Sequence, residues 1–185
     1  MSDITLPRNN IKITTGALVC EDSKLRGDIT IGKDTIVHPM ATIIAESAPI
    51  IIGENCLIEE QAKIVYRVPF DRVEDKDNIP PLIIGSFNVF EVGCHVEAAK
   101  IGDSNVFESK CFVGNKVSVS NGCTIGAGCQ LTNEQELKEN IIVYGEKCQM
   151  REGLSKPLPQ YSQMETLMKI LPSYHHIKKP TQKTK

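Results

Sequence analysis

Three side chains that metals and catalysts commonly use lie close together near the middle of this 185-residue chain: Cys94, His95 and Glu97. A thiolate, an imidazole and a carboxylate can hold Zn²⁺ together, and an imidazole beside a carboxylate can act as a general base. His38 is the one other histidine before the C-terminal tail. Whether these groups form a site depends on the elements that carry them.

A six-residue repeat predicts those elements. An aliphatic or aromatic residue recurs at every sixth position from Ile13 to Leu131, with slips after Ile43 and Val96 and a longer break after Ile64. A small residue usually follows four positions later. Such hexads form short strands, three to a triangular coil, and successive coils stack about 4.8 Å apart with both kinds of residue pointing inward. The chain is therefore predicted to be an all-β parallel β-helix.

The repeat also gives the cysteines a structural interpretation. The small inward position of the hexad holds five of the seven cysteines: Cys56, Cys94, Cys111, Cys123 and Cys129. A thiol is a small and often buried side chain, so Cys94 is interpreted as a core residue. His95 comes one position later and should point outward, away from Cys94. His38 should also face outward, about three coils away, so the pattern does not favour a metal centre, and we expect no cofactor.

The organisation of the chain follows from where the repeat breaks. We predict a β-helix over residues 11–150, with an excursion loop over about 65–83 where charges and three prolines interrupt the hexads. The hexads fade after Leu131, and one last strand, "IIVYG", is expected to close the stack. Residues 151–185 should form a linker, a short C-terminal α-helix and a basic tail without ordered structure.

The C-terminal helix is predicted over residues 162–171. Ser162 and Glu165 form a capping-box pattern at its start, and Pro172 is expected to end it. A stripe of apolar residues at helical spacing should pack against the β-helix. This stripe consists of Met164, Leu167, Met168 and Leu171.

The residues just before the inward positions should face outward, and they differ between faces of the coil. One face carries an apolar column: Leu18, Ile36, Leu57, Val89 and Val106. The next face begins with Lys24, Thr42, Lys63 and His95. Contiguous apolar surface is usually covered, so the column should be either the seat of the C-terminal helix or a contact with another protein. The sequence leaves both alternatives open.

An acidic row should follow the edge of this apolar face. Glu59, Glu91 and Glu108 come directly after inward positions of its strands, and like charges opposite one another in a sheet are destabilising. One interpretation is a solvated row with slightly raised pKa values. The alternatives are a metal ion, a basic partner surface, or the lysines of the tail.

Composition narrows the classes of partner. The formal net charge is -2 and the pI is about 6.1, which does not favour binding to nucleic acid or to anionic membranes. No apolar run approaches the roughly 20 residues of a membrane span. Seven cysteines without a CxxC pair indicate reduced thiols. We therefore expect a cytoplasmic protein.

The hexad pattern resembles the left-handed parallel β-helix family, and this resemblance implies the handedness. This family includes the γ-class carbonic anhydrases, and the resemblance of the chain to them implies zinc-binding histidines at three places. This chain has Val65 and Tyr66 in the first region, and Val92 and Glu97 at the other two. The family also includes acyltransferases that use a histidine as general base, a role that His38 or His95 could serve. Both enzyme classes remain as alternatives.

A narrower resemblance rests on the segments "RGDITIG", "IIIGENCLIEEQA", "IIGSFNVFEVGC" and "LMKILPSYHHIKK". From about Ile11 to Lys179 the chain is similar to the β-helix subunits of the dynactin pointed-end complex. The resemblance implies a non-enzymatic, cytoskeleton-associated scaffold without catalytic or metal-binding residues, acting in dynein-driven transport along microtubules. It also implies a sister β-helix subunit as heterodimeric partner, with the pointed-end actin-related protein and other dynactin subunits alongside.

Overall fold

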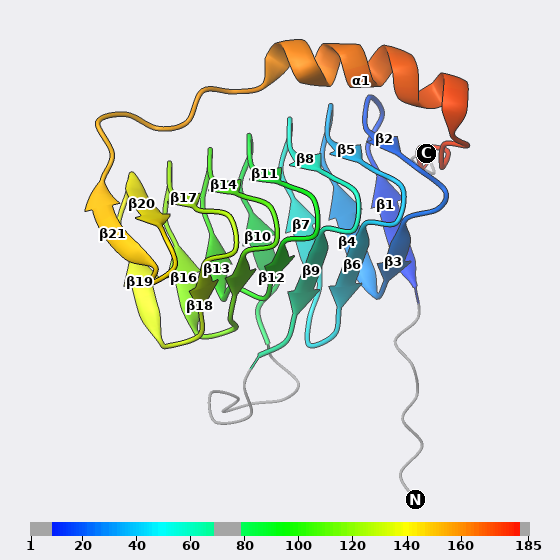
Figure 1. Ribbon diagram of the computed structural model, residues 1–185. Helices are drawn as coiled ribbons and strands as arrows, with labels where there is room; N and C mark the ends of the chain where they lie inside the picture. Colours follow the sequence, from blue (N-terminus) through cyan, green and yellow to red (C-terminus); the bar gives the residue numbers. More distant parts are fainter. Residues whose placement is uncertain (1–8, 69–78, 182–185) are drawn as a thin grey trace, which may run out of the picture.

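The chain winds into a parallel β-helix with one α-helix laid along its outside (Figure 1). The computed structural model describes residues 9–68 and 79–181. Three sheets form the sides of the coil, and nearly all of their strand pairs are parallel. The predicted all-β parallel β-helix with a C-terminal helix is confirmed. None of the helical structure in the described part of the chain is both long and apolar enough to cross a membrane.

Each sheet collects one strand from successive coils. The first sheet contains β1 (Asn10–Ile13), β4 (Asp28–Ile31), β7 (Ile50–Ile52), β10 (Leu82–Ile84), β13 (Lys100–Ile101), β16 (Val117–Val119) and β19 (Gln135–Leu137). The second contains β2 (Leu18–Val19), β5 (Ile36–Val37), β8 (Leu57–Ile58), β11 (Val89–Phe90), β14 (Val106–Phe107), β17 (Thr124–Ile125), β20 (Ile141–Tyr144) and β21 (Gln149–Glu152). The third contains β3 (Lys24–Arg26), β6 (Thr42–Ala45), β9 (Lys63–Tyr66), β12 (His95–Val96), β15 (Phe112–Val113) and β18 (Gln130–Leu131).

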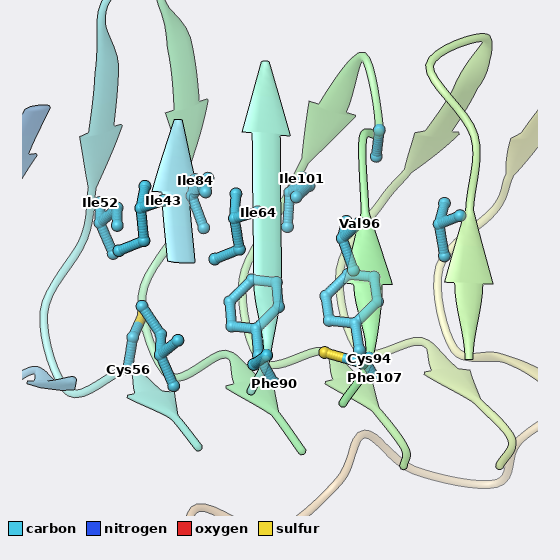
Figure 2. Close-up of a cluster of buried hydrophobic side chains, with 14 of the residues drawn as sticks. Ile43, Ile52, Cys56, Ile64, Ile84, Phe90, Cys94, Val96, Ile101 and Phe107 are labelled. Carbon is cyan, nitrogen blue, oxygen red and sulfur yellow. The ribbon is translucent and has the colours of Figure 1, made fainter. Parts of the chain in front are cut away.

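The interior consists of ladders of like side chains, as the hexads predict. Ile52, Ile84 and Ile101 pair in register and are buried one above another. The rings of Phe90 and Phe107 stack with their centroids 4.7 Å apart and their planes within 4° (Figure 2). The five cysteines at the small hexad position are all buried, so their predicted role as core residues is confirmed.

Two buried asparagines take the place of small residues at one corner of the coil. Asn88 Nδ2 donates hydrogen bonds to the carbonyl oxygens of Gly85 and Gly102, both at 2.8 Å. The backbone N–H of Asn105 donates to Asn88 Oδ1, and that of Cys123 donates to Asn105 Oδ1. These side chains satisfy backbone groups that the tight corner leaves without a strand partner.

The end of the β-helix contains more structure than the fading hexads predict. β19 continues the first sheet through the charged stretch "TNEQELKEN", because Leu137 still fills the inward position. β20 is not the last strand. After it, the chain turns back and β21 pairs with it in the antiparallel sense, which covers the outer edge of the second sheet.

The C-terminal helix α1 (Tyr161–Tyr174) is longer than predicted at both ends. The capping box does not form: the N-cap is Gln160, without a side-chain cap, and Ser162 lies inside the helix. Pro172 does not end the helix either. It stands in the last turn, where a proline removes few hydrogen bonds because the helix is about to end.

The described part of the tail after α1 makes defined hydrogen bonds with the first coil, which corrects the prediction of an unstructured tail for these residues. The backbone N–H of Lys178 donates to the carbonyl oxygen of Val19 (2.8 Å), and that of Glu21 donates to His176 (2.8 Å). Further on, Thr181 N–H donates to the carbonyl oxygen of Ile13 (3.0 Å). The tail therefore lies along the exposed edge of the first coil.

The excursion from the coil is shorter than the predicted range of 65–83. Val65 and Tyr66 belong to β9, and β10 already begins at Leu82, while residues 69–78 of the excursion lie outside the described residues. Its two flanks are held together because the Tyr66 hydroxyl donates to the carbonyl oxygen of Pro80 (3.0 Å). An ion pair between Arg67 and Glu46 lies beside them.

Candidate functional site

Cys94, His95 and Glu97 do not converge on one site. The Cys94 side chain points into the interior of the coil (Figure 2), whereas His95 lies on the outer face of the third sheet. His95 Nε2 is 3.1 Å from Glu97 Oε1, without the angle of a hydrogen bond, and the imidazole meets the ring of Phe112 edge to face. Burial lowers the pKa of His95, and the charge of Lys63 lowers it further, although Glu97 opposes this.

His38 is buried, which corrects its prediction as an outward surface residue. It follows Val37, the strand neighbour of Val19, beside the place where the tail pairs with the first coil. His38 Nδ1 is 2.7 Å from Glu60 Oε1, and its buried Nε2 has no hydrogen-bond partner in the described structure. Across the described residues, no three His, Cys, Asp or Glu side chains are placed to hold a metal ion.

The buried thiols are poorly suited to nucleophilic chemistry. Burial raises the pKa of Cys56 to about 12 and that of Cys20 to about 11. A hydrogen bond with Cys111, together with burial, raises the pKa of Cys94. The thiolate is the reactive form of cysteine, so these side chains are held in their unreactive form.

The apolar column forms a second hydrophobic cluster outside the coil. Its five residues begin β2, β5, β8, β11 and β14, and all except the partly buried Val106 are buried. α1 lies along this face (Figure 1), with Met164 and Leu171 buried against the column and Leu167 and Met168 partly buried. The helix of this same chain therefore occupies most of the column.

The acidic row links each coil to the next. Glu59 Oε2 accepts a hydrogen bond from the backbone N–H of Val92, and Glu108 Oε2 accepts one from that of Ala127. Glu91 Oε2 accepts from both the N–H and the Oγ of Ser109, at 2.9 and 3.0 Å. Burial raises the pKa of Glu59, and the neighbouring Glu91 adds to this. Each of these carboxylates thus accepts a hydrogen bond from a backbone amide of the next coil.

Sequence analysis misses several exposed apolar residues near the end of the β-helix. Leu154 and Leu158 are almost fully exposed in the segment that leads to α1, and Tyr144 and Met150 are exposed on β20 and β21. Tyr144 and Met150 lie on opposite faces of the β20–β21 pair, because Met150 is paired with the buried Val143, the neighbour of Tyr144. We name Leu154 and Leu158 the terminal leucines. The signal for the two leucines in the sequence is that both stand outside the hexads, and that Leu158 is flanked by Pro157 and Pro159.

The chain resembles known proteins along most of its length. It is 52% identical over 176 residues to dynactin subunit 6 of Xenopus tropicalis, covering 95% of this chain and 88% of that protein. It is 49% identical over 174 residues to dynactin subunit 6 of Danio rerio, covering 93% and 89%. No family model matches the chain.

A solved structure shares the fold. A hexapeptide transferase family protein from Anaplasma phagocytophilum superimposes with a TM-score of 0.68 at 17% identity, covering 89% of this chain and 92% of that one. This likeness shows the left-handed β-helix fold of hexapeptide-repeat proteins, and it carries nothing about activity. Identities of this size to the two vertebrate proteins, over most of the chain, show that all three proteins belong to one family. The chain belongs to the dynactin subunit 6 family.

Proposed function

We propose that this chain is a non-enzymatic structural component of dynactin that supports dynein-driven, microtubule-based transport in the cytoplasm. The observation that carries the proposal is the 52% identity to a dynactin subunit 6 along 95% of the chain. In this proposal, the chain pairs with a sister β-helix subunit, and together they dock beside the pointed-end actin-related protein and other dynactin subunits. The docking is rigid, because coils that brace one another lose little conformational entropy on binding.

The contacts of the apolar column favour its role as the helix seat over a role in partner binding. Leu18, Ile36, Leu57 and Val89 are buried in the same cluster as Met164 and Leu171 of α1. A partner could reach them only after displacing the helix. In the same way, Glu59, Glu91 and Glu108 accept hydrogen bonds from amides of neighbouring coils, so we assign them to the stability of the β-helix rather than to direct contact.

The terminal leucines are the better candidate for the partner contact. Their side chains are large and almost fully exposed, and they lie in the segment between β21 and α1. Covering these exposed leucines in a contact with another protein would remove apolar area from water, which favours association. A sister β-helix subunit packed there would cover Leu154 and Leu158, which few described residues of this chain cover.

Two observations weigh against the enzyme alternatives. The His38–Glu60 pair has the contact that an acyltransferase base would need, but His38 is buried, so an acyl donor could not reach it. For a zinc enzyme of the carbonic anhydrase kind, the positions expected to carry imidazoles hold Val65, Tyr66, Val92 and Glu97 instead. A zinc-bound hydroxide needs such ligands.

The test is size-exclusion chromatography with light scattering on the full chain, alone and mixed with the sister β-helix subunit, with zinc analysis of each peak. We expect a zinc-free chain that moves into a heteromeric complex. Changing Leu154 and Leu158 together to serine should weaken that complex about tenfold, whereas Ile83→Ser, an exposed apolar change on the first sheet, should not. A homotrimer with stoichiometric zinc would overturn the proposal.

A further inference from the structure

The third sheet has an unpaired edge where the first coil begins. β3 is hydrogen-bonded to β6 on one side, and its other edge has no strand partner among the described residues. The neighbouring edges differ, because the tail bonds to β2 at Val19 and Glu21 and to β1 at Ile13. The tail therefore leaves the edge of β3 open as far as Gly27, whose N–H donates to Asn9 Oδ1 and whose carbonyl oxygen accepts from the Asn10 N–H.

A hollow of about 690 Å³ lies beside this edge, and its charged lining is entirely basic. Lys24 and Arg26 come from β3 itself, and Lys178 and Lys179 come from the tail. The floor and walls include the apolar side chains Ile11, Ile13, Leu25 and Ile44. No carboxylate lines the hollow, since Glu21 and Asp22, the acids of the turn before β3, lie outside the lining.

The cations of the hollow have few partners within the protein. Within residues 9–68 and 79–181, Lys24, Arg26 and Lys179 make no ion pair. Lys178 Nζ donates a hydrogen bond to the backbone carbonyl oxygen of Glu21 (2.8 Å), and no carboxylate of the described residues forms an ion pair with it. Four like charges around an apolar floor favour an occupant that is both acidic and partly apolar.

We propose that this hollow binds an acidic, extended segment of another protein, which adds to the edge of β3 as a further strand. An open strand edge offers backbone donors and acceptors to an extended chain. At β3 these are the groups of Leu25, because the Lys24 N–H donates to Ala41 on the side of β6 and backbone groups alternate along a strand. Lys24 and Arg26 are two residues apart and lie on the same face of the strand, so every second side chain of the added segment faces them. Carboxylates at those positions meet the cations of β3 and of the tail. This binding needs no dynactin subunit and goes beyond the proposed function.

The test measures fluorescence anisotropy of a fluorescein-labelled peptide of five Glu-Val repeats added to the full-length chain. We expect saturable binding that weakens with salt, and none to a matching peptide of five Lys-Val repeats. The double variant Lys24→Glu/Arg26→Glu should bind the acidic peptide about tenfold more weakly at low salt. The matched control Lys63→Glu/Lys100→Glu, two exposed strand lysines of the middle coils, should bind it like the unchanged chain. Equal binding by both double variants would overturn the site.

A second probe separates strand addition from simple charge attraction. N-methylation of alternate residues along one edge of the Glu-Val peptide keeps every carboxylate but removes the backbone donors that a strand needs. We expect the methylated peptide to lose at least tenfold in affinity, and equal affinity would overturn strand addition. Binding of phosphatidylserine vesicles that depends on Lys24 and Arg26, without binding of the peptide, would replace the acidic segment by a membrane surface.

Discussion

The outer faces of the second and third sheets belong to the same coils, but α1 covers the first of these faces and the other is exposed. On the second sheet, the residues that begin β5 and β8 are Ile36 and Leu57, and both are completely buried beneath α1. One hexad later in each coil, the third sheet presents Thr42 and Lys63, and Lys63 is exposed. The interior ladders beneath the two faces are alike.

This difference shows that the repeat determines the coil, while the residue just before each inward position determines what covers it. The β-helix forms from the inward aliphatic and small residues, whatever residues occupy its outer faces. Covering one face then depends on an apolar column tall enough to hold a short helix. A helix of 14 residues would be marginal alone, so the column stabilises α1 as much as α1 covers the column.

The largest effect should come from placing a charge beneath α1. Leu57→Asp buries a carboxylate without a partner, so we expect the free energy of unfolding to fall by about 3 kcal/mol. The matched change on the bare face of the same coil, Lys63→Asp, should alter it by less than about 0.5 kcal/mol. Urea denaturation measures both, and proteolysis at the segment before α1 should accelerate only in Leu57→Asp. Equal effects would show that α1 does not protect its face.

The acidic row at the edge of the covered face should have the next largest effect. Glu91→Ala removes the acceptor of two hydrogen bonds from Ser109, and we expect a loss of about 1.5 kcal/mol. Glu91→Gln keeps an acceptor oxygen and should recover most of that loss, as thermal unfolding can show. If the glutamine variant were as unstable as the alanine variant, the charge rather than the hydrogen bonds would be the stabilising feature.

Removing the tail should expose the edge of the covered sheet at a smaller cost. Deleting residues 176–185 leaves the Glu21 N–H without its partner and frees the carbonyl oxygen of Val19. Water can replace part of these bonds at an edge, so we expect a loss of about 1 kcal/mol. Hydrogen exchange at Glu21 should accelerate, whereas exchange at the His95 N–H, which donates to Cys111 in mid-stack, should not change.

The smallest effect concerns pH, and it should differ in its range between the two faces. The folded pKa of His95, on the bare face, is lowered, so the unfolded chain binds the proton first and stability falls as the pH drops below about 6.5. For Glu60, beside the covered face, burial alone would raise the pKa, but His38 lowers it overall. Stability from this group is present above about 4.5 and is lost as the pH falls through the lowered pKa.

Urea midpoints at pH 7.5, 5.5 and 3.5 can separate these two ranges. His95→Phe should reduce the change between pH 7.5 and 5.5 and leave the change at lower pH as it was. Glu60→Gln should do the reverse. A His95→Phe chain with an unaltered dependence above pH 5.5 would contradict the role assigned to the lowered pKa of His95.

Sequence analysis could predict whatever repeats. The period of six determines which residues point inward, so the burial of Cys94 and the outward position of His95 follow from it. The apolar column and the helical stripe of α1 follow from their spacing in the same way. Their contact with one another does not, because a partner protein would satisfy the same pattern.

Features that depend on a neighbouring coil or on a single long-range contact could not be predicted. The row of Glu59, Glu91 and Glu108 suggests repulsion until the stagger of the coils shows an amide facing each carboxylate. Pro172 is a helix breaker in general, but its cost depends on where the last turn falls. The tail has no hexads. Ile177, which pairs with Cys20, is the only tail residue whose type suggests this contact.

The contact between Ile13 and Thr181 also determines when, during synthesis, the edge of the first strand can be covered. The two residues are 168 positions apart, so the first strand is made long before the segment that covers its edge. At about 5 to 20 residues per second, this delay lasts roughly 8 to 34 s. During that time the nascent coil presents a bare strand edge beside the ribosome, where chaperones and neighbouring nascent chains compete for it.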